Sequence, residues 1–404
     1  MLRITYASLR ERDKRKDGPV RIGVDALLLQ RPEVGMGQHL FHLLRGLDQY
    51  DRENRYILLS PRFRRASIGR FPQLSDRFQN IEVVSALRRF GERFERLWWE
   101  QGGVVRASHR EHIELLHCPY FTAPYFLPAR TVVTVHDVIP LVMPEYRARP
   151  ESKAYTSLVA FTVRRVDAII TVSEYSKRDI MRTLGIPEKR IHVTGNAVDE
   201  SCRPITDTRV IDAVRERYGI GPRYILYFGG FDVRKNVDRV LQAYKALPGP
   251  VREEYQLVIA GRLHLLGHPL YPDPRPRVRE LGLDDQVVVT GQIREQDKAP
   301  LYSAAAVYLF PSLYEGFGIP VLEAMACGAA VITSNISALP EVAGDAAYLV
   351  NPYDTAAITR AIEELLEDGG RRDALRERAL ARARQFSWQR VAQQTLEVYK
   401  KLAA

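Results

Sequence analysis

Two glutamates, Glu315 and Glu323, lie eight positions apart on either side of a glycine bend in the stretch SLYEGFGIPVLEAMACG. Two carboxylates at this spacing could form an acid/base pair, lie on the surface as separate charges, or hold a ligand between them. Both lie near the start of a predicted helix, where the helix dipole lowers carboxyl pKa values. We therefore expect two carboxylates that accept hydrogen bonds from ligand hydroxyls.

The bend between them has the residues that a strand-to-helix turn requires. Gly316 and Gly318 allow a tight or positive-φ backbone, and Pro320 suits a first helical turn. The sequence predicts a helix from about Ile319 to just before Gly328. Because helical side chains tilt toward the N-terminus, the Glu323 carboxylate is expected to point back toward the bend, so that both acids flank one ligand.

Two adjacent cations follow a second glycine turn, in YFGGFDVRKNVDRVLQAY. Arg234 and Lys235 come where a helix is predicted to begin, although the positive end of a helix dipole disfavours cations. An anion such as a diphosphate would neutralise these two cations. The arginine guanidinium could bind it through two parallel hydrogen bonds, and the lysine ammonium would act as a point charge. The alternative is a pair of exposed basic residues.

The first half of the chain offers two further turns. In TVVTVHDVIP, an apolar strand ends at His136 and Asp137; neutral imidazole could donate to a sugar hydroxyl or a developing charge, or His136 could be structural. In QRPEVGMGQHLFHLL, Gly35 and Gly37 open a predicted helix whose N–H groups could approach a phosphate, or they form a plain helix entry. The third glycine of a dinucleotide fingerprint is missing, which argues against an NAD site.

Apolar, β-branched runs alternate with helix-period segments, as in parallel sheets with crossover helices. Strands are predicted in two series, at 20–29, 55–60, 81–85, 115–120, 130–138, 166–173 and 190–198, then at 223–230, 255–261, 286–292, 305–312, 329–335 and 346–351. We predict Rossmann-like domains at 1–200 and 201–385, joined near Asp199–Asp207, and a final helix at 386–404. Ligands in such sheets bind beyond the carboxyl ends of the strands, where these turns lie.

Composition narrows the function classes. The 404 residues are 46% apolar and 27% charged, as in soluble globular proteins. Cys118, Cys202 and Cys327 form no CxxC pair, so neither a disulfide framework nor a zinc site is predicted, and a reducing cytoplasm fits. No secretion signal or spanning segment is apparent. The sequence contains no Asp-x-Asp, GxxxxGK[ST], HExxH or GxSxG motif, so no metal site is predicted.

The net charge of +10 is concentrated in the first half, where residues 1–200 hold 33 Lys+Arg against 24 Asp+Glu, while residues 201–404 hold 26 against 25. Basic runs at Arg62–Arg70 and Arg88–Trp99 mix arginines with aromatic residues. They could face an anionic surface, either membrane headgroups or nucleic acid, or they could form a solvated helix.

Together these motifs make the sequence resemble retaining glycosyltransferases of family 4, which have the GT-B fold of two facing Rossmann-like domains. The resemblance spans about Val20 to Leu402 and depends on EGFGIPVLE, GAAVITSNISALPEVAGDAA and TVSEYSKRDI. The stretches GVDALLLQRPEVGMGQHLFHLL, LWWEQ, VHDVIP and RKN are most similar to the bacterial mannosyltransferase-B-like branch. This resemblance implies that the final helix crosses back onto the first domain.

The resemblance also implies roles on the donor side of the cleft. Glu315 would bind donor-sugar hydroxyls, and Glu323 would bind the nucleotide ribose. A donor-binding run would hold the sugar and diphosphate through its backbone, namely Gly316, Phe317, Gly318 and Ile319.

Further implied roles concern the leaving group and the acceptor. Arg234 and Lys235 would neutralise the diphosphate, and His136 would contact the sugar from the first domain. Gly230 occupies a donor-side position where many members have arginine, so Arg234 would take over that task. The acceptor and phosphate side would be lined by Gly35, Gly37 and Asp137.

The function expected from these roles is transfer of a hexose, with retention and without a metal or other cofactor, to a glycan or lipid-linked acceptor. GDP-mannose is the donor favoured by resemblance. The protein would work in the cytoplasm, in peripheral contact with an anionic inner membrane face and without nucleic acid. Alternatives are a UDP-sugar-dependent glucosyl- or N-acetylglucosaminyltransferase, an inverting transferase, a sugar-nucleotide epimerase and a two-domain sugar-binding protein.

Overall fold

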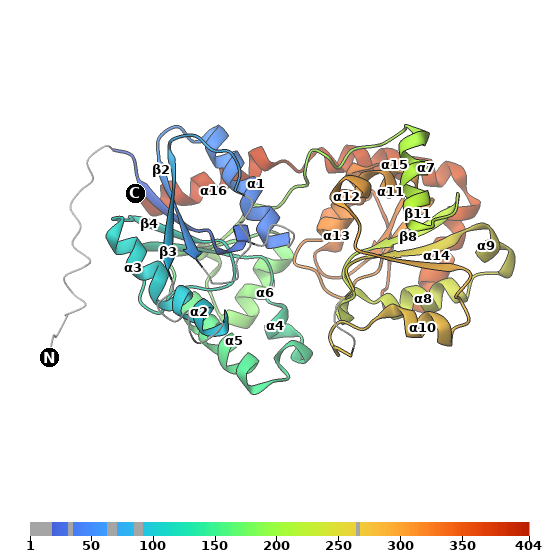
Figure 1. The fold of residues 1–404 in the computed structure, drawn as a ribbon, viewed down its shortest axis with the longest axis horizontal. Helices are drawn as coiled ribbons and strands as arrows, with labels where there is room; N and C mark the ends of the chain where they lie inside the picture. Colours follow the sequence, from blue (N-terminus) through green and yellow to red (C-terminus); the bar gives the residue numbers. More distant parts are fainter. Residues whose placement is uncertain (1–17, 31–34, 63–70, 85–91, 264–266, 404) are drawn as a thin grey trace.

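A computed structural model describes residues 18–30, 35–62, 71–84, 92–263 and 267–403, which form two α/β units side by side (Figure 1). The first unit has a seven-stranded sheet in the order β3-β2-β1-β4-β5-β6-β7, and the second has a six-stranded sheet in the order β10-β9-β8-β11-β12-β13. All recorded strand pairs are parallel. The predicted α/β class and pair of doubly wound sheets are confirmed.

The strands match the predicted series. Their bounds are β1 (Arg21–Asp25), β2 (Arg55–Arg62), β3 (Phe78–Val84), β4 (Leu115–Cys118), β5 (Arg130–Val135), β6 (Ala168–Thr171), β7 (Ile191–Val193), β8 (Tyr224–Phe228), β9 (Gln256–Ala260), β10 (Val287–Gly291), β11 (Val307–Phe310), β12 (Val331–Ser334) and β13 (Tyr348–Val350). Strands at the centre of each sheet, such as β4 and β11, are buried along their whole length, as expected when helices cover both faces.

Helices connect successive strands. In the first unit they are α1 (Gly35–Tyr50), α2 (Glu92–Trp98), α3 (Val104–Arg110), α4 (Ile139–Val142), α5 (Pro150–Val163) and α6 (Glu174–Leu184), with 3₁₀ turns at Leu27–Gln30, Pro144–Arg147 and Glu188–Arg190 and a π-turn at Trp99–Gly103. In the second unit they are α7 (Thr208–Tyr218), α8 (Val237–Lys245), α9 (Gly249–Glu254), α10 (Pro274–Glu280), α11 (Lys298–Ala304), α12 (Ile319–Ala326), α13 (Leu339–Ala343), α14 (Thr355–Glu367) and α15 (Gly369–Ala383), with 3₁₀ turns at Val233–Lys235 and Glu295–Asp297. The final helix, α16 (Trp388–Ala403), follows the second unit in the chain.

The topology fixes where a ligand can bind. In the first sheet β1 lies between β2 and β4, and in the second β8 lies between β9 and β11. The direction of winding reverses at these two points, and in such sheets ligands bind beyond the carboxyl ends of the strands there. The segments that follow β5, β8 and β11 carry the residues singled out above.

The last helix returns to the first unit, as predicted (Figure 1). α16 packs on α1, where a Cβ at Gly46 would lie 2.8 Å from the Ala392 side chain. The Tyr399 hydroxyl contacts His117 Nδ1 at 2.6 Å, and His117 Nε2 contacts Thr134 Oγ1 at 2.7 Å. Among the described residues no helix is long and apolar enough to cross a membrane.

Candidate active site

The centre of the site is a buried cluster of one carboxylate and two cations. Glu315 Oε1 lies 2.5 Å from Lys235 Nζ, and Glu315 Oε2 lies 2.8 Å from Arg234 Nη1. The Ser312 hydroxyl also donates to Glu315 Oε1 at 2.7 Å. The cations that the sequence marked as unusual at a helix start therefore face the first glutamate of the pair.

Local structure in the second unit positions these cations. Asp232 caps the turn Val233–Lys235 by accepting from the Arg234 N–H, and Asn236 ends it in the left-handed conformation at φ 64°. The Asn236 side-chain amide donates to the carbonyls of Pro311 and Pro352, at 2.9 and 2.8 Å. The RKN turn is thus tied to the end of β11, which brings it beside Glu315.

Burial and charge act in opposite directions on Glu315. Burial raises the pKa of a carboxyl, but Arg234 and Lys235 outweigh it and lower the pKa of Glu315 to about 2. Burial lowers the pKa of Lys235, and the neighbouring Arg234 lowers it further. Glu315 is therefore a carboxylate at neutral pH, as expected from the sequence.

The glycine bend contacts the first unit directly. A Cβ at Gly316 would lie 2.2 Å from the His136 carbonyl oxygen and 2.9 Å from the Asp137 Cβ, so only glycine fits there. The Gly316 carbonyl accepts hydrogen bonds from the hydroxyls of Ser173, at 2.6 Å, and Ser176, at 2.9 Å. The bend is clamped between β5 and α6.

The helix prediction for this stretch is confirmed, because α12 runs from Ile319 to Ala326 with proline in its first turn. Gly318 has φ 111°, a conformation that favours glycine. Phe317 is buried in the core of the second unit. Its ring meets that of Phe386, with 5.7 Å between the ring centroids.

The expectation for Glu323 was partly wrong. Its pKa is raised rather than lowered, because burial disfavours the charge more than Lys298 favours it. Glu323 Oε2 accepts from the Tyr302 hydroxyl at 3.1 Å, and Oε1 lies 3.8 Å from Lys298 Nζ. The two glutamates belong to separate polar networks, Glu315 with the RKN turn and Glu323 with α11.

His136 is a neutral imidazole with one free nitrogen. Burial lowers its pKa to about 4, and a hydrogen bond to the Pro119 backbone only partly opposes this. Nε2 has no partner among the described residues, so Nδ1 donates to the Pro119 carbonyl and Nε2 is left as an acceptor. The sequence suggested a donor; this tautomer would accept a hydrogen bond from a ligand hydroxyl.

The remaining predicted residues lie around this centre. Gly35 begins α1 and Gly37 is buried in its first turn. Asp137 Oδ1 accepts from the Ile139 N–H at 3.1 Å; burial raises the Asp137 pKa, which Arg234 counteracts. Apart from its chain neighbours, no described heavy atom lies within 4 Å of a Cβ built at Gly230, so a larger residue would meet no clash there at Cβ.

Sequence reasoning missed several residues of the site. His39, two residues after Gly37, meets the His136 ring at 4.7 Å between centroids, and its Nδ1 lies 3.3 Å from Asn196 Oδ1. Ser173 and Ser176 lie in TVSEYSKRDI, which was noted for resemblance without a role. The two serines lie three residues apart, Ser173 at the N-cap of α6 and Ser176 in its first turn. That spacing was the signal available in the sequence.

Two more contacts join the units beside the bend. The Tyr314 hydroxyl donates to Asp179 at 2.7 Å. The Glu341 carboxylate on α13 accepts from the backbone N–H groups of Glu174, at 2.9 Å, and Tyr175, at 3.1 Å. A carboxylate of the second unit thereby caps the N-terminus of α6 in the first.

Comparisons with known proteins agree with this architecture. Residues 34–201 match the family described as Glycosyltransferase Family 4, and residues 210–382 match Glycosyl transferases group 1. O-antigen chain mannosyltransferase B of Escherichia coli is 34% identical over 288 residues, which cover 71% of this chain and 74% of that protein. The serotype-specific mannosyltransferase WbdA of Escherichia coli is 32% identical over 283 residues, 68% of this chain but 34% of that protein.

The sucrose-phosphate synthase structure from Thermosynechococcus elongatus supports the fold alone. It superposes with a TM-score of 0.73 at 21% identity, covering 95% of this chain and 99% of that one. With two matching family regions, a relative above 30% identity and the GT-B arrangement of two facing sheets, the chain belongs to glycosyltransferase family 4 and is a hexosyltransferase.

Proposed function

We propose that the protein transfers mannose from a nucleotide sugar to a glycan hydroxyl, with retention of the anomeric configuration. The single observation that carries this proposal is the buried cluster of Glu315 with Arg234 and Lys235 beside a glycine bend. The mannosyltransferase names of the two relatives support the choice of sugar.

In the proposed reaction the bond between the anomeric carbon and the diphosphate oxygen breaks, and a bond from that carbon to the acceptor oxygen forms on the same face. The acceptor proton passes to the departing phosphate oxygen. Arg234 and Lys235 stabilise the charge that develops on the diphosphate, and because they are already held in place this costs little reorganisation. Metal ions perform this task in other transferases, so we propose that none is required.

Glu315 would accept hydrogen bonds from donor-sugar hydroxyls, and the lone pair of His136 Nε2 would accept one from the opposite side. Glu323 would bind the ribose from its separate position near α11. Replacing Glu315 by Gln should lower kcat far more than donor affinity, whereas Glu323→Ala should mainly raise the donor KM. Negligible and equal effects from both would contradict these roles.

GDP-mannose is the proposed donor, and a UDP-linked hexose is the second candidate. A panel of nucleotide sugars, tested for thermal stabilisation and for slow hydrolysis, separates the two. NMR of the product's anomeric configuration tests retention and distinguishes an inverting transferase or an epimerase. Activity that disappears with EDTA and returns with manganese would contradict metal independence.

We further propose that the acceptor is lipid-linked and that the first unit contacts an anionic membrane at the inner face. The large apolar side chains of this unit that are exposed by 37% to 59% include Phe94, Leu97, Tyr125, Phe126, Tyr155 and Phe161. The Arg165 guanidinium lies 4.9 Å from the centroid of the Tyr125 ring, which combines cationic and aromatic groups as interfacial sites do. The basic run Arg62–Arg70, apart from Arg62, lies outside the described residues.

Liposome co-sedimentation tests this surface. Phe126→Ser with Phe161→Ser should reduce binding to anionic vesicles at low salt. Tyr353→Ser is the matched control, because Tyr353 is an aromatic residue of the second unit with 59% exposure. Equal loss in both variants, or no binding by the unaltered protein, would contradict the proposal.

A further inference from the structure

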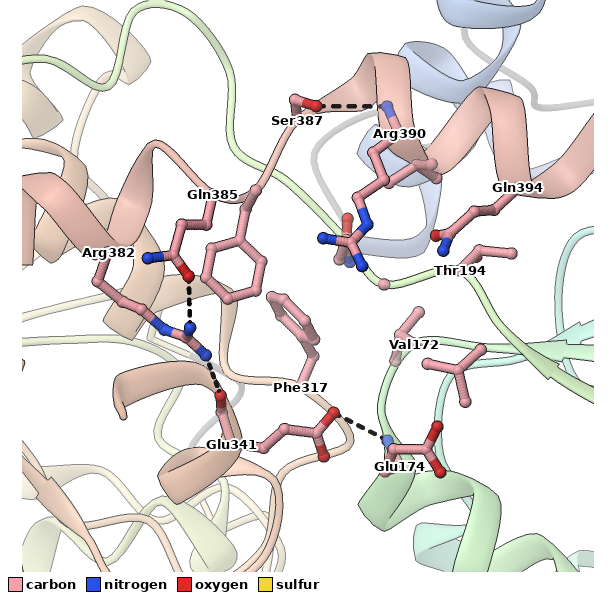
Figure 2. A pocket seen from close by; sticks show the side chains of 15 residues that line it. Val172, Glu174, Thr194, Phe317, Glu341, Arg382, Gln385, Ser387, Arg390 and Gln394 are labelled. Carbon is pink, nitrogen blue, oxygen red and sulfur yellow. Dashed lines mark hydrogen bonds between the residues drawn. The ribbon is translucent and has the colours of Figure 1, made fainter. Parts of the chain in front are cut away.

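A cavity lies between the units, apart from the cluster of Glu315 with its two cations. It has a volume of about 390 Å³ and is bounded by the segment after β7, by Phe317 of the bend and by the crossing from α15 to α16 (Figure 2). We call it the hinge pocket. Its volume falls within the range of about 300–1,000 Å³ that is usual for small-molecule sites.

One buried polar group of the hinge pocket has no partner. Thr194 is 3% exposed, and its Oγ1 makes no hydrogen bond to any described residue. A buried hydroxyl without a partner costs about 1–3 kcal/mol, so native proteins normally satisfy such groups. Because Thr194 lines the cavity, a bound molecule would supply the missing partner.

The charged side chains that line the pocket differ in how many partners they have. Arg382 donates to the carbonyls of Val342 and Glu341 and to Gln385 Oε1, at 3.0, 2.6 and 2.6 Å. Both carboxylate oxygens of Glu341 are occupied by α6. Arg390 has no recorded side-chain partner in the described part of the chain, and Figure 2 shows its guanidinium extending from α16 into the pocket.

The opposite wall is aromatic. The rings of Phe317 and Phe386 meet edge to face and border the cavity, and Figure 2 shows Phe317 at this wall. Gln394, on the same helix as Arg390, lines the cavity together with Thr194. An aromatic surface, one exposed guanidinium with no ion-pair partner among the described residues, and a few hydroxyl and amide groups match a small ring that carries both hydroxyls and a phosphate.

We propose that the hinge pocket binds a sugar phosphate monoester, with its phosphate on Arg390, its hydroxyls on Thr194 and Gln394, and its ring against Phe317. The ligand touches both units and the crossing segment at once. Phe317 lies between the two glycines of the bend, so occupation of the hinge pocket favours the clamped arrangement of the bend and acts on donor binding from outside the donor cleft.

Isothermal titration tests the proposal with mannose 6-phosphate as the probe, and with mannose and inorganic phosphate as comparison ligands. GDP or UDP, whichever stabilises the protein, is present in excess to fill the donor cleft. The expected result is saturable binding of the sugar phosphate that exceeds binding of either comparison ligand. Absence of saturable binding, or equal affinity for inorganic phosphate, would overturn the proposal.

Variants locate the binding. Arg390→Ala should raise Kd at least about tenfold, and Thr194→Val about tenfold, as expected for lost hydrogen bonds to a charged and a neutral partner. Arg384→Ala is the matched control, because Arg384 is an exposed arginine of the same crossing outside the pocket. Unchanged affinity in Arg390→Ala would refute the site. The experiment requires no turnover, so a wrong donor assignment would not affect it.

Discussion

Replacement of Glu315 by Gln gives a two-part prediction. The fall of its pKa from 4.5 to about 2 corresponds to about 3 kcal/mol of folding stability at neutral pH. This stabilisation is present above the unfolded-state pKa and is lost as the pH falls through the folded-state pKa. The variant removes it and leaves Arg234 and Lys235 without their carboxylate, so Tm should fall by about 6–12 °C at pH 7.

The second part concerns ligand binding. A nucleoside diphosphate brings negative charge to the two cations that have lost the Glu315 carboxylate, so it should stabilise Glu315→Gln by more than it stabilises the unaltered protein. Differential scanning calorimetry with and without the nucleotide measures both effects. Glu367→Gln is the control, since Glu367 is exposed at the end of α14. An unchanged Tm, or the same nucleotide-induced shift in both proteins, would refute this electrostatic account.

Three further predictions concern the clamp around the bend. Gly316→Ala should lower kcat/KM at least about tenfold, because its Cβ would lie 2.2 Å from a carbonyl oxygen. Gly230→Ala should have little effect, and similar activities of the two variants would show that this steric clash does not matter. Joint Ser173→Ala and Ser176→Ala should raise the donor KM about thirtyfold, at about 1 kcal/mol for each of the two hydrogen bonds lost to the Gly316 carbonyl, and an unchanged KM would show that the clamp is dispensable. Because the pKa of His136 is about 4, the imidazole stays neutral above that pH. The pH profile of kcat should therefore show no inflection caused by His136 between about pH 5 and 8. An inflection in that range that disappears in His136→Gln would disprove this prediction.

The strands could be predicted from sequence because most are short apolar runs, and those at the centre of each sheet, such as β4 and β11, are buried along their whole length. The prediction extended too far after β1, where 27–30 continue the apolar run but form a 3₁₀ turn. Asp25 Oδ1 accepts from the Leu27 N–H at 3.0 Å and bends the chain there. Apolar periodicity cannot reveal such a local side-chain hydrogen bond.

The site was only partly predictable, for a related reason. Glu315, Arg234 and Lys235 could be identified because cations at a helix start and a glutamate before a glycine bend are locally unusual. The pKa of Glu323 was predicted in the wrong direction because burial by α11 outweighs the helix-start effect. The Ser173 hydroxyl was missed because its acceptor, the Gly316 carbonyl, belongs to the other unit.

The return of α16 to the first unit has a consequence for protein synthesis. The core of the first unit includes Val391, Leu396 and Tyr399, although its last strand ends at Val193. A nascent chain therefore completes its first sheet long before the helix that covers it has been made. In the meantime the binding face for α16 stays open, so the second unit must be synthesised before the first can finish folding. Unlike the first of two independent domains in tandem, the first unit therefore cannot complete its core until α16 has been synthesised.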